Sequence, residues 1–161
     1  MIIEIQGDLF TTTADVIGHG CNCVGGFGSG IAGQIANIYP NVKAAYWNYH
    51  IKVGWKLGDV QYVDIGNSDH RTIVNCATQK EYLPRNKNHA NYAAIKRILL
   101  KLKDYCQANN KSLALPRIGC GLAGGQWDLT DFQKEHKLYQ HTIKQIYEEV
   151  FHDFNVEVYY L

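Results

Sequence analysis

Two glycine-rich stretches, each directly after a short apolar run, constrain this chain more than any other feature. In the first, five glycines fall between Gly25 and Gly33, after the run 15–20 and before a helical pattern of isoleucines. In the second, the run 113–116 leads into R-I-G-C-G-L-A-G-G-Q-W. A strand followed by a glycine-rich turn and a helix start aims backbone N–H groups and a helix dipole at one point. The sequence therefore predicts two anion-binding loops, with phosphate as the favoured anion.

Strand-like and helix-like patterns alternate along the chain. Alternating or fully apolar short runs predict strands at 2–5, 15–20, 57–65, 72–76, 113–115 and 156–161. Apolar residues at helical spacing predict helices at 29–38, 40–54, 89–108 and 134–151. This order is typical of an α/β protein with helices on both faces of a mixed sheet. We expect one domain over residues 1–161, a turn at Gly66 and Asn67, and the last strand at a sheet edge.

The overall charge and the cysteines exclude several classes of protein. The net charge is +1 and the basic residues are scattered, which argues against an extended nucleic-acid track. The five cysteines are odd in number and show no framework spacing, so we expect free thiols in a reducing compartment, and the cytoplasm as the location. No leader or membrane-spanning run is visible, so no membrane partner is expected.

Familiar nucleotide and metal motifs fit the chain poorly. Both loops match the dinucleotide pattern G-x-G-x-x-G, but the segment after the first match is helical and lacks the acidic strand end that this pattern needs. Neither loop carries the lysine ending of a nucleoside-triphosphate loop. His19, Cys21 and Cys23 lack the fourth ligand of a structural zinc site. No metal and no cofactor is therefore expected.

Four polar residues follow predicted strands and are candidates for ligand contact. His19 and Asn22 lie beside the first loop, where a histidine satisfied by local backbone is the alternative. Lys80 follows the strand at 72–77, although a loop lysine is usually solvated. Asp8 follows the first strand and either caps a turn or accepts from an adenine amino group. The chain leaves each alternative open.

The same motifs together resemble a macrodomain. They are G-D-L near the start, H-x-C-N-C and G-S-G-I-A in the first loop, Y-P after its helix, and P-R-I-G-C-G-L-A-G-G-x-W in the second. The likeness runs from Gly7 to the C-terminus. It is greatest to the branch with the terminal ADP-ribose protein glycohydrolases and the ADP-ribose-1''-phosphate phosphatases, which shares a short V-Y-x-L ending.

The resemblance implies a three-layer α/β/α domain that binds ADP-ribose across the strand ends. Asp8 and Leu9 would hold adenine, the two loops would hold the diphosphate, and Asn22 would face the distal ribose. His19 matches the histidine of the phosphatase type, and Lys80 falls near the attacking lysine of the glycohydrolase type. The full set of expected contacts is Asp8, Leu9, Gly20, Cys21, Asn22, Gly28, Ser29, Gly30, Ile31, Ala32, Pro116, Arg117, Ile118, Gly119, Cys120, Gly121, Leu122, Ala123, Gly124, Tyr159 and Leu161.

One departure from the glycohydrolase pattern changes the expected reaction. The chain has Ala123 where that type carries an acid–base aspartate, so the lysine–aspartate mechanism cannot operate in its usual form. We therefore expect a monomeric hydrolase that releases phosphate from ADP-ribose 1''-phosphate, with His19, Asn22 and Lys80 as catalytic candidates. His19 would protonate the leaving oxygen or orient water. The alternatives are a reader of free or protein-linked ADP-ribose without turnover, and removal of ADP-ribose from a protein or nucleobase through Lys80. A dinucleotide-dependent dehydrogenase is the most distant alternative.

Overall fold

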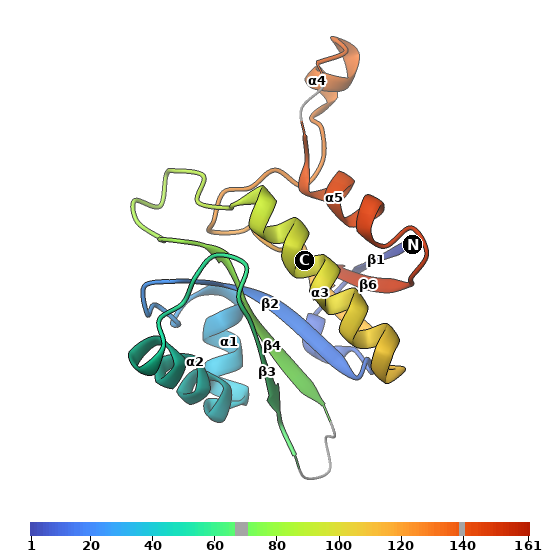
Figure 1. The fold of residues 1–161 in the computed structure, drawn as a ribbon. Coiled ribbons are helices and arrows are strands. Elements are labelled where there is room, and N and C mark those ends of the chain that lie inside the picture. Colours follow the sequence, from blue (N-terminus) through green and yellow to red (C-terminus); the bar gives the residue numbers. More distant parts are fainter. Residues whose placement is uncertain (67–70, 139–140) are drawn as a thin grey trace.

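The computed structural model describes residues 1–66, 71–138 and 141–161, and it contains the predicted alternation of strands and helices (Figure 1). The strands are β1 (Ile2–Gln6), β2 (Val16–Asn22), β3 (Val60–Asp64), β4 (Thr72–Gln79), β5 (Leu113–Pro116) and β6 (Val156–Tyr160). The helices are η1 (Leu9–Thr11), α1 (Gly30–Ile38), α2 (Pro40–Lys52), α3 (Tyr92–Asn109), α4 (Asp131–Glu135) and α5 (Ile143–Val150). The predicted turn at Asn67 lies outside the described residues.

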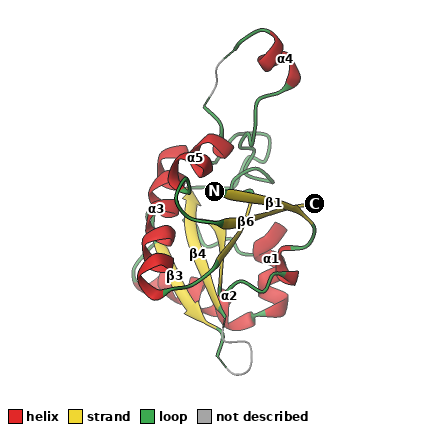
Figure 2. Ribbon diagram, turned by 90° about the vertical axis from the view of Figure 1, so that its right-hand side faces the viewer, coloured by secondary structure: helices red, strands yellow, loops and turns green. Residues whose placement is uncertain are grey.

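The described strands form one mixed sheet in the order β1-β6-β5-β2-β4-β3. The pairs β1–β6, β6–β5, β5–β2 and β2–β4 are parallel, and β3 runs antiparallel to β4. Helices α3 and α5 cover one face, while α1 and α2 lie on the other (Figure 2). The three-layer α/β/α arrangement predicted from the sequence is confirmed.

Two hydrophobic cores, one on each side of the sheet, follow from the alternation of side chains along the central strands. In β2, Val16 packs toward α3 and α5, whereas Ile17 and Cys21 pack toward α1 and α2. In β4, Val74 packs toward α3 and α5, and Ile73 packs toward α1 and α2. Because β2 is buried on both faces, its direction is fixed, and its end delivers the first glycine loop to a defined place.

Two predictions about the C-terminal third were wrong. The last strand is not at an edge, because β6 pairs with both β1 and β5 and β1 is the edge strand. The predicted helix 134–151 is interrupted: α4 lies on an arm away from the sheet, and α5 begins only at Ile143 (Figure 1). Lys137 has a φ of 52°, which the interior of a right-handed helix does not accommodate, and Thr142 forms a capping box with Gln145 that starts α5. Tyr139, predicted on the inner helix face, lies outside the described residues.

The state of the cysteines agrees with the composition. All five are free thiols, and burial raises the pKa of Cys76 and Cys120 to about 12. Within the described ranges, no helix has the length and apolar character that crossing a bilayer requires.

Candidate functional site

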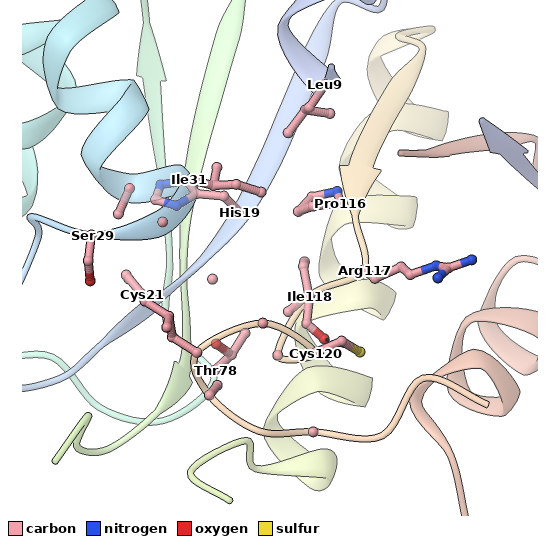
Figure 3. Close-up of a pocket in the computed structure, with 18 of the residues that line it drawn as sticks. Leu9, His19, Cys21, Ser29, Ile31, Thr78, Pro116, Arg117, Ile118 and Cys120 are labelled. Atoms are coloured by element: carbon pink, nitrogen blue, oxygen red, sulfur yellow. Dashed lines mark hydrogen bonds between the residues drawn. The ribbon is translucent and has the colours of Figure 1, made fainter. Parts of the chain in front are cut away.

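A cleft of about 1030 Å³ lies where β2, β4 and β5 end, and both glycine loops line it (Figure 3). Parallel strands deliver their carboxyl ends to the same edge, which is where open α/β sheets bind ligands. The volume is at the upper end of the range of about 300–1,000 Å³ for small-molecule sites. The two loops, separated by more than 80 residues in the chain, therefore share one site.

The first loop ends at the N-terminus of α1 with its backbone donors unused. Ser29 is the N-cap, and its side chain makes no capping hydrogen bond. The N–H groups of Gly30, Ile31 and Ala32 have no acceptor among the described residues. Gly30 has a φ of 60°, in the left-handed region that favours glycine. Three free donors at the positive end of a helix dipole suit a phosphate group.

Gly33 lets the loop pass close to this helix. A Cβ atom at Gly33 would lie 2.9 Å from the backbone oxygen of Gly28. The loop therefore reaches its position only because α1 has no side chain there.

We expect the substitution Gly33→Ala to weaken binding of ADP-ribose, the ligand expected from the sequence, about tenfold without destabilising the fold. Alanine favours the helix by about 1 kcal/mol over glycine, but its methyl group must push Gly28 and the loop aside. Calorimetric titration and urea unfolding measure the two effects separately. The control Asn37→Ala lies on the exposed side of the same helix and should leave affinity unchanged. Unchanged affinity in the Gly33 variant would contradict the close approach.

Asn22 and Tyr46 hold the first loop in shape. The Asn22 Oδ1 atom accepts hydrogen bonds from the backbone N–H groups of Val24 and Gly26 and from the Tyr46 hydroxyl. Its Nδ2 atom donates to the Gly26 oxygen at 2.7 Å. The Tyr46 hydroxyl also accepts from the Gly25 N–H at 3.1 Å. Asn22 lines the cleft as expected, but most of its hydrogen-bonding capacity already serves its own loop.

Tyr147 holds the second loop in a matching way. Its hydroxyl donates to the Pro116 oxygen at 2.7 Å and accepts from the Ile118 N–H at 3.1 Å. The Gly125 N–H closes the loop on the Gly119 oxygen. The N–H groups of Gly121, Leu122 and Ala123 have no acceptor in the described part of the chain. The second loop therefore adds another set of free donors to the cleft.

His19 lines the cleft from β2 but is fully buried. Its Nε2 atom lies 2.5 Å from Asn75 Oδ1, and its ring meets the Phe27 ring edge-on at 5.5 Å. Burial lowers the pKa of His19 to about 4, against the opposing effects of Asn75 and of the Gly20 backbone. The imidazole is therefore neutral at pH 7, which argues against a role as proton donor.

Most of the expected contact residues lie together at the cleft. Asp8 and Leu9 line it beside Tyr159 and Leu161, and all the expected loop residues except Gly124 line it too, with Gly125 present instead. The Asp8 carboxylate also accepts from the Phe10 N–H as the cap of η1, so it lies at the cleft and caps a turn as well.

Lys80 and Arg117 are placed differently from the rest. Lys80 is exposed and does not line the cleft, although its backbone oxygen accepts from the Cys23 N–H at the start of the first loop. Arg117 lines the cleft, but its guanidinium points away from it (Figure 3). That group pairs with Glu4 at 2.9 Å and lies 3.9 Å from the centre of the Tyr160 ring.

Sequence reasoning missed several residues of the cleft. They are Gly7, Gly26, Gln34, Thr78, Gln79, Tyr82, Arg85, Gly125, Trp127 and Tyr160. Gly26 and Gly125 could have been found by extending the two loops. Tyr82 and Arg85 lie in K-E-Y-L-P-R after β4, where the strand-end rule that selected Lys80 applies equally.

The cleft offers little acid–base chemistry of its own. Among the described residues that line it, Asp8 carries the one carboxylate side chain, and it belongs to the end formed with Leu9. Ala123 is buried at the position where the glycohydrolase type carries an aspartate. No cluster of three or more histidine, cysteine or acidic side chains suited to a metal occurs within the described ranges. Neutral backbone donors dominate the site.

Comparison with known proteins gives consistent results. The family profile of the Macro domain matches residues 19–131. An uncharacterised 17.5 kDa protein of Enterobacteria phage T4 is 30% identical, over 81% of this chain and 86% of the phage protein. The ADP-ribose 1''-phosphate phosphatase of Lodderomyces elongisporus is 27% identical, over 79% of this chain and 86% of its own length.

Solved structures extend the comparison to the whole fold. The macrodomain of Mycobacterium tuberculosis DarG superposes with a TM-score of 0.77 at 26% identity and covers 99% of this chain and 97% of that domain. The DNA ADP-ribosyl glycohydrolase of the same organism is 29% identical over 80% of this chain, which corresponds to 36% of that protein.

Proposed function

This chain belongs to the macrodomain family, and we propose that it binds ADP-ribose in the cleft and hydrolyses ADP-ribose 1''-phosphate to ADP-ribose and phosphate. The observation that carries this proposal is the convergence of two sets of free N–H groups on one cleft, Gly30–Ala32 from the first loop and Gly121–Ala123 from the second. Backbone donors bind a diphosphate without a lysine or a metal ion. The related phosphatase of Lodderomyces elongisporus supports the choice of reaction.

The ligand's direction follows from the two ends of the cleft. We place adenine at the end formed by Asp8, Leu9 and Tyr159, and the distal ribose at the end near Asn22 and Tyr82. The terminal phosphate then lies beside the second loop and Arg85, which gives it donors separate from those of α1.

The proposed hydrolysis needs little beyond positioning and charge stabilisation. One water molecule is consumed, the bond between the C1'' oxygen and phosphorus is broken, and the ribose oxygen takes up a proton. Free N–H groups of the second loop stabilise negative charge that develops on the phosphate, an effect worth about 10²–10³ in rate per donor. His19, neutral in its buried position, would orient the water.

Phosphate release tests the proposal directly. The protein is incubated with ADP-ribose 1''-phosphate, and inorganic phosphate is measured while ADP-ribose is followed by chromatography. We expect equal amounts of the two products. Tight binding of ADP-ribose with no phosphate release would instead identify a reader without turnover. An absence of ADP-ribose binding would remove the proposal altogether.

A second candidate is removal of ADP-ribose from nucleic acid, favoured by the likeness to the mycobacterial DarG macrodomain. The segment after β4 carries Lys80, Arg85 and Lys87 next to Tyr82 at the cleft. Basic and aromatic side chains together are suited to binding single-stranded nucleic acid.

The substitution Lys80→Ala distinguishes the two reactions. Because Lys80 is exposed and does not line the cleft, we expect phosphate release to stay within about twofold of wild type, well below the 10²–10⁴ that general acid–base residues contribute. Release of ADP-ribose from a modified oligonucleotide should fall strongly in the same variant if the lysine reaction operates. Equal loss of both activities would contradict the assignment of Lys80 to one reaction.

A further inference from the structure

A chain of side-chain hydrogen bonds links His19 to a main-chain carbonyl of α2. His19 faces Asn75 on the neighbouring strand β4, and Asn75 faces Gln61 on β3. Asn75 Nδ2 donates to Gln61 Oε1 at 3.0 Å, and Gln61 Nε2 donates to the Ala45 oxygen at 3.0 Å. Three adjacent strands thus carry one continuous line of polar groups across the α1–α2 face of the sheet.

The Ala45 oxygen at the α2 end of this line determines which group donates and which accepts in each hydrogen bond. A carbonyl oxygen only accepts, so Gln61 must turn its NH₂ group to Ala45 and its oxygen to Asn75. Asn75 must then turn its NH₂ group to Gln61 and its oxygen to His19. Facing an acceptor, His19 Nε2 carries the ring proton. In the neutral ring Nδ1 then holds a lone pair.

The lone pair of Nδ1 has no donor. Nδ1 is buried without a hydrogen-bond partner among the described residues. The Gly20 backbone raises the pKa of the ring, which is the effect of an acceptor and not of a donor, and it forms no hydrogen bond with Nδ1. A buried polar atom without a hydrogen-bond partner destabilises the folded state. Figure 3 shows His19 on the same side of the cavity as Ser29 and Ile31. Because Nδ1 has no accessible surface, a donor from the cleft reaches it only when the surrounding side chains shift.

We propose that Asn75 and Gln61 are positioning residues that hold His19 in the tautomer with a bare Nδ1, and that Nδ1 accepts a hydrogen bond from a hydroxyl of ADP-ribose or from a water in the cleft. The ligand half of this inference rests on the proposed function. The tautomer half rests on the side-chain network alone. Of the two roles expected for His19, the arrangement selects orientation of water over protonation of the leaving oxygen.

Nitrogen-15 NMR of histidine-labelled protein tests the tautomer without reference to activity. A ring nitrogen that carries a proton and one that carries a lone pair differ clearly in shift and in N–H coupling. The variant His19→Gln assigns the His19 signals among those of the seven histidines. At pH 7 we expect the proton on Nε2, and we expect saturating ADP-ribose to move the Nδ1 signal.

The variant Gln61→Met removes the link to Ala45 while filling a similar space. Asn75 is then free to turn, so the tautomer with a proton on Nδ1 should appear, and kcat for phosphate release should fall while KM stays constant. The control Tyr62→Phe changes the neighbouring residue of β3, which packs on the opposite face, and should leave the tautomer and kcat unchanged.

Two results would overturn the inference. A proton on Nδ1 in the wild-type protein would refute the directional network, whatever the protein binds. An unmoved Nδ1 signal in the saturated ADP-ribose complex would refute the contact with the ligand. If the tautomer is as expected and ADP-ribose does not bind, the proposed contact with the ligand is refuted together with the proposed function. The proposed hydrogen-bond network is then still supported.

Discussion

Replacing both Tyr46 and Tyr147 by phenylalanine is expected to weaken ADP-ribose binding about 100-fold, since each 1.4 kcal/mol corresponds to a factor of ten. Each hydroxyl donates to the last residue of a strand, Asn22 in β2 or Pro116 in β5, and accepts a hydrogen bond from a backbone N–H of the following loop. Phenylalanine at position 46 leaves the Gly25 N–H without an acceptor, at about 1–3 kcal/mol. Phenylalanine at position 147 leaves the Ile118 N–H with the Pro116 oxygen as its remaining acceptor. The loops should then no longer hold their free donors in one arrangement.

The two single variants and the double variant measure the contribution of each loop to ADP-ribose binding separately. Because Tyr46 and Tyr147 lie on opposite faces of the sheet, their effects should add. Calorimetric titration with ADP-ribose and with AMP distinguishes disordered loops from a general loss of the fold. AMP has a single phosphate, so disordered loops should weaken its binding less than that of ADP-ribose. The control Tyr105→Phe removes a hydroxyl that makes no hydrogen bond in the described chain and packs far from the loops, against Tyr62. Wild-type affinity in the double variant would show that the loops hold their shape without the tyrosines.

The free energy of unfolding is expected to fall by about 3 kcal/mol between pH 6.5 and pH 4 because of His19 alone. Burial lowers the pKa of His19 in the folded protein from 6.5 to about 4. Above pH 6.5 the ring is neutral in both states and contributes nothing. As the pH falls, the unfolded chain takes up a proton that the folded protein refuses, so stability is lost until pH 4.

Urea unfolding at several pH values measures this loss. The variant His19→Gln has no titrating group at this position, so its free energy of unfolding should fall less over the same interval. The difference between the two losses should equal the contribution of His19. The pKa values of Glu4, Asp15 and Asp128 are lowered by their hydrogen bonds and nearby lysines, and they add an acid-dependent loss that both proteins share. The control Asn37→Gln changes an exposed residue of α1 that does not titrate and should follow the wild-type curve. Parallel curves for wild type and His19→Gln would mean that His19 titrates normally.

The chain's local pattern was sufficient for most of the architecture. Period-two alternation, helical apolar spacing and glycine at turns act over a few residues, so they can be read without knowing the fold. The pattern predicted the three layers, the start of α1 at Ser29 or Gly30 and both glycine loops. It failed where local periodicity continued through a break, as at Lys137, whose positive φ ends the helical path.

The tertiary structure decided which side chains serve the site. Asn75, 56 residues from His19, determines the state of its ring, and no spacing in the sequence relates the two. Tyr46 and Tyr147 resemble core residues in their helices, yet each holds a loop brought to it by a different strand. Lys80 follows a strand that ends at the site but is itself exposed. The sequence by itself determined that two anion-binding loops exist, because glycine patterns are local; only the packing of distant strands decided that they meet in one cleft and which groups hold them there.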